Sequence, residues 1–207
     1  MKNSKPLYYH LLPSILVLFV LSLDQYLKFW VKMNMFIGSS SEIVVFKNWF
    51  ILHFTENNGM AFGIGLGGEL GKYLLTLFRI LAVGAITWYI ISLKRKNASF
   101  GFIMVLSLIL AGAIGNILDS TFYGVIFSQS TPFNKSLLMP ETGGYSAWFQ
   151  GKVVDMLYFP LIETYWPHWV PVIGGNSFVF FRPVFNLADS AISIGVFSIL
   201  LFYRKHF

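Results

Sequence analysis

Four long apolar stretches constrain the fold of this chain more than any other feature of its sequence. They cover residues 12–31, 73–93, 100–118 and 184–203. Each has the length of roughly 20 residues that a helix needs to cross a hydrocarbon core about 30 Å thick. The composition agrees, because 56% of the 207 residues are hydrophobic and only 12% are charged. We therefore predict an all-α polytopic membrane protein with four transmembrane helices, forming a single integral membrane domain over residues 1–207.

The basic residues indicate how these helices are oriented. Lysines and arginines gather at both chain ends and between the second and third stretches: Lys2, Lys5, Lys94, Arg95, Lys96, Arg204 and Lys205. None of the nine acidic residues lies in these places. Because cytoplasmic loops collect positive charge, we expect cytoplasmic termini, with segments 32–72 and 120–183 on the outer face. Topology thus explains the net charge of +6, and no nucleic acid partner is expected.

The first apolar stretch also has features of a secretory signal peptide, because Lys2 and Lys5 precede it. However, no cleavage site of small residues follows, and the stretch continues past Asp24 and Lys28, so we expect an uncleaved helix. The aspartate precedes the lysine by four residues, which is the favourable order for an ion pair on one helix face.

The outer segments contain strand and turn patterns. Residues 43–46 and 49–54 have the pattern of two short strands, and Lys47-Asn48 lies between them as a turn. This arrangement predicts a small β-hairpin. Asn58-Gly59 is a further turn signal. Prolines and glycines interrupt the long segment 120–183, so we expect a long outer loop between the third and fourth helices, part of it a mobile lid.

Four aspartates converge in this topology, because Asp24, Asp119, Asp155 and Asp189 all fall near the outer ends of the predicted helices. Carboxylates in or beside a membrane are costly and usually functional. Two carboxylates that share one proton activate water in aspartic proteases, without a covalent intermediate. Asn186 and Asp189 are placed to share one helix face, and we expect Asp189 to meet Asp155 from a loop upstream.

Other functions have weaker support from the sequence. The chain has no cysteine, and its four histidines are dispersed without a His-Glu-x-x-His motif, so we expect no metal site. A Ser–Lys dyad is not excluded by spacing. A proton-coupled transporter is an alternative because buried acids also form proton relays, although no inverted repeat is present. A non-catalytic assembly factor would not need two acids at one depth.

Five polar motifs follow one another along the chain. In order they are Asp24-Gln25-x-x-Lys28, Asn57-x-Gly59-x-Ala61-Phe62, Gly115-Asn116-x-x-Asp119, Gly151-x-Val153-Val154-Asp155 and Phe185-Asn186-x-Ala188-Asp189. Together they resemble the lipoprotein signal peptidases (signal peptidase II). The resemblance implies an aspartic endopeptidase of the bacterial inner membrane with its active site toward the periplasm. It would remove the signal peptide of prolipoproteins by cutting just before a diacylglyceryl-modified cysteine.

The resemblance also assigns roles to residues. Asp155 and Asp189 match the family's catalytic dyad. The residues that match its substrate-binding and supporting polar shell are Asp24, Lys28, Asn57, Gly59, Asn116, Asp119 and Asn186. The predicted hairpin would be the family's β-cradle on the membrane surface. The implied partners are diacylglyceryl-modified prolipoproteins, membrane lipids and globomycin-type cyclic peptide inhibitors, with no cofactor and no metal.

Two departures from the family pattern stand out. The family usually has an arginine after the aspartate of the third motif, where this chain has Ser120. Either Arg79 or Arg182 replaces that arginine, or its role is dispensable. The segment 120–151 is also longer than the family pattern leads us to expect.

Overall fold

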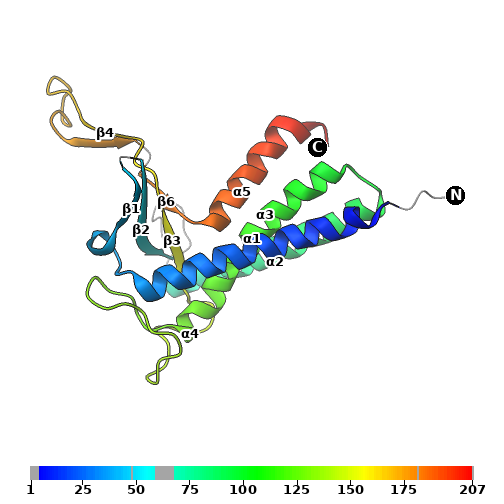
Figure 1. The fold of residues 1–207 in the computed structure, drawn as a ribbon, viewed down its shortest axis with the longest axis horizontal. Helices are drawn as coiled ribbons and strands as arrows, with labels where there is room; N and C mark the ends of the chain where they lie inside the picture. Colours follow the sequence, from blue (N-terminus) through cyan, green and yellow to red (C-terminus); the bar gives the residue numbers. More distant parts are fainter. Residues whose placement is uncertain (1–4, 48, 59–67, 181, 207) are drawn as a thin grey trace.

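The structure is a computed structural model that describes residues 5–47, 49–58, 68–180 and 182–206. Long helices form one end of the molecule and strands form the other (Figure 1). The main helices are α1 (Leu7–Asn34), α2 (Gly68–Arg95), α3 (Phe100–Leu118) and α5 (Leu187–Ser198). A π-helical turn (Asp119–Tyr123) leads α3 directly into the short α4 (Gly124–Ile126), and a second one (Ile199–Tyr203) extends α5.

Three helices in the described part of the chain are long and apolar enough to cross a membrane: Leu7–Asn34, Leu70–Arg95 and Phe100–Ile126. They extend beyond the predicted first, second and third stretches. The apolar helix at the C-terminal end, Leu187–Tyr203, is shorter than these three. It begins later than residue 184 because Val184–Phe185 form a strand, β6, instead of a first helical turn.

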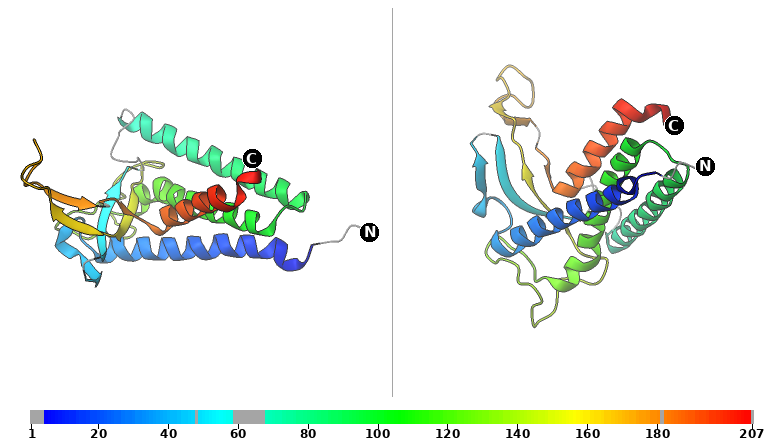
Figure 2. Two further views of the ribbon diagram at one scale, coloured as in Figure 1. Left: turned by 90° about the horizontal axis from the view of Figure 1, so that it is seen from above. Right: turned by 45° about the vertical axis from the view of Figure 1, so that its right-hand side comes forward.

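Helix α3 lies at the centre of the helical layer. It packs against α1, α2 and α5, and Figure 2 shows it between α1 and α2. Two glycines explain the close approach. A Cβ atom at Gly112 would collide with the backbone oxygen of Ala188 in α5, and one at Gly115 would lie 2.8 Å from the Asp24 carboxylate in α1. Small residues at such crossings let helices approach closely, and here they bring two aspartate-bearing helices onto α3.

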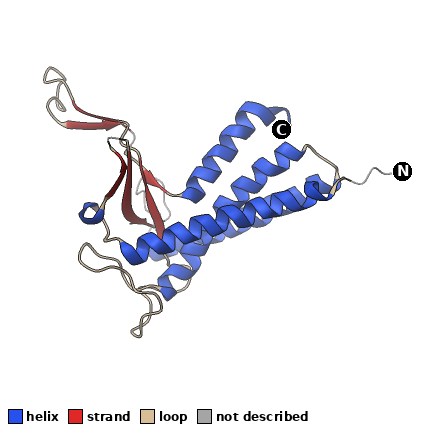
Figure 3. Cartoon of the chain, viewed as in Figure 1, coloured by secondary structure: helices blue, strands red, loops and turns tan. Residues whose placement is uncertain are grey.

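A four-stranded antiparallel sheet covers the outer end of the helices. Its strands are β1 (Ile43–Phe46), β2 (Phe50–Asn57), β3 (Val153–Tyr158) and β6, in the order β1-β2-β3-β6. The predicted hairpin is present as β1 and β2, but the sheet is larger than that hairpin. Strands β4 (Ile162–Tyr165) and β5 (Ser177–Phe180) pair separately as a projecting arm (Figure 3).

The expectation that Asp155 lies in a loop is wrong. It lies in β3, opposite Thr55 of β2. The sheet is fixed to the helices by a buried apolar cluster that includes Val31 of α1, Phe54 of β2 and Met156 of β3. Burying each such side chain contributes about 1.5–3 kcal/mol. This cluster therefore sets the position of β3, and with it Asp155, against the helix ends.

Candidate active site

The N-terminus of α5 is closed by a capping box. The Asn186 side chain accepts a hydrogen bond from the Asp189 backbone N–H at 2.8 Å, and the Asp189 carboxylate accepts one from the Asn186 backbone N–H at 3.4 Å. Asn186 is therefore the N-cap residue rather than a member of the helix face that its spacing from Asp189 predicted. A short polar side chain favours this position because it satisfies a backbone N–H that has no helical partner.

The same asparagine joins α5 to β3. Its Nδ2 donates to Asp155 Oδ1 at 2.7 Å, while Asn57 Nδ2 from β2 donates to Asp155 Oδ2 at 2.5 Å. Asp155 is only 2% exposed. Both oxygens of this buried carboxyl group are thus held by neutral amides.

Asp189 is held by a third amide. Asn116 Nδ2 in α3 donates to Asp189 Oδ1 at 2.7 Å. The oxygen of that amide accepts from Lys28 Nζ at 3.0 Å and from Asn186 Nδ2 at 3.2 Å. The network therefore runs without interruption from Asp155 through Asn186 and Asn116 to Asp189.

Lys28 connects this network to two further acids. It is 0% exposed, and its Nζ lies 2.9 Å from Asp24 and 2.8 Å from Asp119. The pair that the Asp24–Lys28 spacing predicted is present. Asp24 also accepts from the Ala188 backbone N–H at 2.9 Å, and Asp119 accepts from the Val154 backbone N–H at 3.2 Å. These two carboxylates therefore fix α5 and β3 in place.

Asp155 has an unusual affinity for its proton. Burial, together with the nearby charge of Asp189, raises the pKa of Asp155 from 3.8 to about 7, although hydrogen bonds from Asn57 and Asn186 oppose the rise. Loss of hydration disfavours the charged form, and a neighbouring carboxylate does the same. Asp155 thus holds its proton up to near-neutral pH. A protonated carboxyl group beside a second carboxylate is able to exchange protons with a water molecule or a peptide carbonyl.

Most residues of the predicted polar shell come together here, namely Asp24, Lys28, Asn57, Asn116, Asp119 and Asn186. Gly59 lies outside the described residues. Sequence reasoning gave no role to Gln25, whose Nε2 donates to Asp119 at 3.0 Å and whose Oε1 accepts from the Tyr123 hydroxyl at 3.1 Å. Its place beside Asp24 in the first motif was the available signal.

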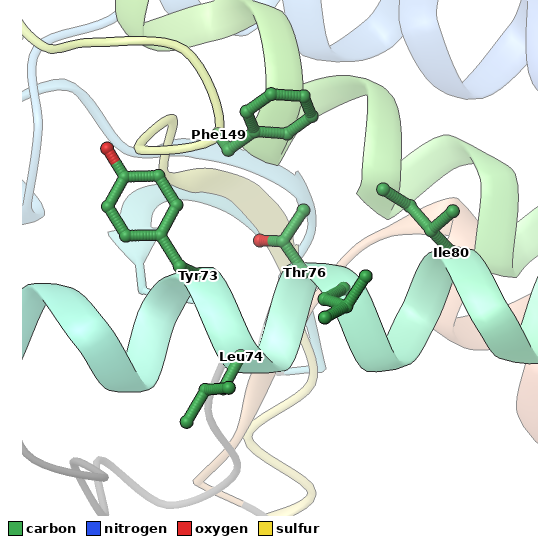
Figure 4. Close-up of a pocket in the computed structure, with 6 residues that line it drawn as sticks. Tyr73, Leu74, Thr76, Ile80 and Phe149 are labelled. Carbon is green, nitrogen blue, oxygen red and sulfur yellow. The ribbon is translucent and has the colours of Figure 1, made fainter.

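An apolar cavity lies between α2 and the segment that carries Phe149. It has a volume of about 270 Å³ and is lined by Tyr73, Leu74, Thr76, Leu77, Ile80 and Phe149 (Figure 4). Phe149 adopts a left-handed backbone conformation (φ 64°), which is uncommon for a residue with a bulky side chain. Its N–H donates to the Thr121 carbonyl at 3.2 Å. In the described parts of the chain, no three histidine or acidic side chains group so as to hold a metal ion.

Apolar helices of spanning length, with a cluster of amide-held carboxyl groups where they meet the sheet, define a membrane-embedded protein with paired carboxyl groups. The family described as Signal peptidase (SPase) II matches residues 16–204. The lipoprotein signal peptidase of Porphyromonas gingivalis is 52% identical over 191 residues, which cover 92% of this chain and 81% of the relative. That of Amoebophilus asiaticus is 44% identical over 187 residues, covering 90% and 75%. The chain belongs to the signal peptidase II family, as its five motifs predicted.

Solved structures support the fold. Two bacterial membrane enzymes determined by the in meso method, at 2.3 Å and 1.9 Å resolution, superpose with TM-scores of 0.57 and 0.56 at 22% and 23% sequence identity. The alignments cover 93% and 91% of this chain, and 87% and 90% of the solved chains. As a member of its family, the protein is a multi-pass membrane hydrolase, an aspartic peptidase that removes the signal peptide from prolipoproteins.

Proposed function

We propose that Asp155 and Asp189 are the catalytic dyad of this peptidase, and that it cuts just before a diacylglyceryl-modified cysteine. The observation that carries the assignment is the hydrogen-bond network in which Asn186 contacts both residues. The other two aspartates of the cluster each contact Lys28 directly, whereas the side-chain hydrogen bonds described for the dyad come from amides.

In this proposal the two carboxyl groups divide the proton transfers. Asp189 stands in the first turn of α5, and it takes a proton from the attacking water. Asp155 gives its proton to the oxygen of the scissile carbonyl as the water oxygen bonds to the carbonyl carbon. When the C–N bond then breaks, the leaving nitrogen takes the proton held by Asp189, and the product acid returns one to the pair.

We further propose that α5 and its π-helical extension form a fourth span in the bacterial inner membrane. Lys94 and Arg95 lie in the last turn of α2, and the ends of the chain lie away from the sheet (Figure 1). This arrangement supports cytoplasmic termini and a periplasmic site. Reporter fusions should place residues 45 and 150 outside, and residue 97 and the C-terminus inside. A periplasmic C-terminus would contradict the fourth span.

The decisive experiment is cleavage of a lipidated prolipoprotein by purified protein in detergent. Asp155→Asn and Asp189→Asn preserve side-chain size but cannot exchange the proton. Each should reduce turnover by at least ~10³-fold, and the double variant should be hardly worse because the pair acts as a unit. Glu141→Gln, the same change at an exposed loop residue, is the matched control and should retain full activity. Near-normal turnover in either dyad variant would refute the assignment.

The proposal extends to ligands and inhibitors. Lipid-modified prolipoproteins would bind from the membrane, and globomycin-type cyclic peptides should compete with them, as the family resemblance implies. Metal chelators should leave the rate unchanged, because the proposed proton transfers need only carboxyl groups and water.

A further inference from the structure

The carboxyl groups around the dyad carry more negative charge than the single positive charge of Lys28 balances. Lys28 is in contact with Asp24 and Asp119, while the described side-chain hydrogen bonds to Asp155 and Asp189 come from asparagines. An amide satisfies the hydrogen-bonding needs of a carboxylate without supplying a positive charge. A buried anion is costly without such a charge. A second cation near the dyad would therefore have a large effect on its protonation.

Arg79 of α2 is placed to provide this charge. Its Nη1 donates to Ser120 Oγ at 3.4 Å, and Ser120 Oγ donates to the Asn116 carbonyl at 3.0 Å. Because the Asn116 side chain donates to Asp189 Oδ1 at 2.7 Å, Ser120 and Asn116 connect Arg79 to the dyad. One turn earlier on this helix, Thr76 is buried and lines the cavity that Phe149 closes (Figure 4).

Arg79 belongs to α2, an element that carries none of the five motifs, and it contacts Ser120 at the end of α3. Arg182, the other candidate from the sequence, is exposed in the segment before β6. An arginine keeps its charge even in a poorly hydrated site, and its planar group directs several donors at once.

We propose that Arg79 is a positioning residue of the dyad, connected to it through Ser120 and Asn116, and that its positive charge favours a pair that carries a single proton. This inference rests on the proposed assignment of the dyad. It also explains how a chain with serine at position 120 maintains a positive charge at this end of α3.

The effect of removing Arg79 on the pH profile follows from the charged groups in the network around Asp189. They are Asp155 from β3, Asp119 from the π-helical turn after α3, Asp24 and Lys28 from α1, and Arg79 from α2. Without Arg79, three carboxyl groups and one shared lysine remain. The first deprotonation of the pair then becomes harder, so the acidic limb of the kcat profile should move to higher pH.

The test compares Arg79→Gln, Arg79→Lys and Arg182→Gln in the full-length protein, with kcat and KM measured against pH on a lipidated prolipoprotein. An opposite charge near a carboxylate typically changes its pKa by 1–3 units. Arg79→Gln should therefore move the acidic limb upward by about one unit and lower kcat ~10–100-fold, with KM changed less than ~3-fold. Arg79→Lys should retain most of the wild-type limb, and Arg182→Gln should match wild type.

A relocation variant separates charge from packing. The double variant Arg79→Gln/Ser120→Arg moves the positive charge from α2 to position 120, which is the residue that Arg79 contacts. This variant should regain at least ~10-fold of the lost kcat and restore the acidic limb. Ser120→Ala, which removes only the tether, should cost less than Arg79→Gln.

The outcomes distinguish this inference from the dyad assignment. If Arg79→Gln lowers kcat but leaves the acidic limb in place, and relocation gives no recovery, Arg79 is only a packing residue and the inference is wrong. Activity in Asp155→Asn or Asp189→Asn would instead refute the dyad itself. Thermal unfolding of each variant in detergent identifies any variant that fails to fold. If Arg79→Gln does not fold, the position of the acidic limb of the kcat profile is still measured in Arg79→Lys.

Discussion

Two buried ionic clusters lie along the same helix, α1, and they differ in the partners of their carboxyl groups. Lys28 and Lys32 are four residues apart in α1, and both are 0% exposed. Lys28 belongs to the cluster that contains Asp24 and Asp119 and is connected to Asp155 and Asp189 through Asn116 and Asn186. Lys32 belongs to a second cluster, the outer cluster, formed with Glu56, Ser130, Tyr145 and Lys152.

In the outer cluster the carboxylate is paired with cations. Glu56 contacts Lys32, accepts from the Ser130 hydroxyl at 2.9 Å and lies 3.4 Å from Lys152. Lys32 also lies over the Tyr145 ring, 5.0 Å from its centroid. These contacts join α1, β2 and the segment that follows α4. The outer cluster is therefore an anchor for the long outer segment.

The difference between the clusters is the nature of the carboxylate's partner. A cation in contact stabilises only the charged form of a carboxylate, whereas a neutral amide leaves the charged form less favoured when the group is buried. Burial and the charge of Asp189 raise the pKa of Asp155 to about 7, and the hydrogen bonds from its amide partners oppose this rise only in part. A buried carboxyl group without a cation in contact is thus able to take up and release a proton near neutral pH.

The largest expected effect comes from removing the lysine of each cluster. Lys28→Met would leave Asp24 and Asp119 buried without their cation, which should cost ~3–5 kcal/mol of stability and abolish cleavage. Lys32→Met leaves Glu56 with Lys152 and Ser130, so it should cost ~1–3 kcal/mol and preserve most activity. Thermal unfolding and cleavage assays in detergent measure both effects. Equal losses of stability and of cleavage in the two variants would show that the two clusters have the same role.

A second effect, spread over several pH units, should appear in the pH dependence of stability. Because the pKa of Asp155 is raised from 3.8 to about 7, the folded protein holds a proton that the unfolded chain loses between about pH 4 and pH 7. Stability should therefore fall as pH rises through that window, by up to ~1.4 kcal/mol per pH unit, and level off above it. Asp155→Asn should flatten this slope in unfolding temperatures recorded from pH 5 to pH 8. An unchanged slope in that variant would mean that another group is responsible.

The smallest expected effect is in the outer cluster. The Tyr145 hydroxyl accepts a hydrogen bond from the Lys152 backbone N–H at 2.7 Å, and burial raises the pKa of Tyr145 above its ordinary value, so it stays neutral in this pH range. Tyr145→Phe should cost ~1 kcal/mol, keep the wild-type pH slope and leave turnover within ~2-fold. A large loss of turnover would place the outer cluster in the catalytic machinery.

The local parts of this arrangement could be predicted from the sequence. Apolar length located the helices, and a spacing of four residues predicted the Asp24–Lys28 pair, because both depend on neighbours along the chain. The position of Asp155 in a strand depends on pairing with β2, where Asn57 is 98 residues away. The contact between Arg79 and Ser120 spans 41 residues. No spacing rule connects such partners, so only the folded chain reveals them.

The pairing of β3 with β6 has a consequence for how this protein tolerates change. Leu157 pairs with Phe185 and Tyr158 with Val184, so the chain leaves the sheet and returns to it at adjacent positions. The projecting arm of β4 and β5 is inserted between those positions (Figure 3). Its length is therefore independent of the spacing between Asp155 and Asp189, which Asn186 fixes. A change in the length of this arm, or a reporter group grafted onto it, should therefore leave the spacing of the two aspartates unchanged.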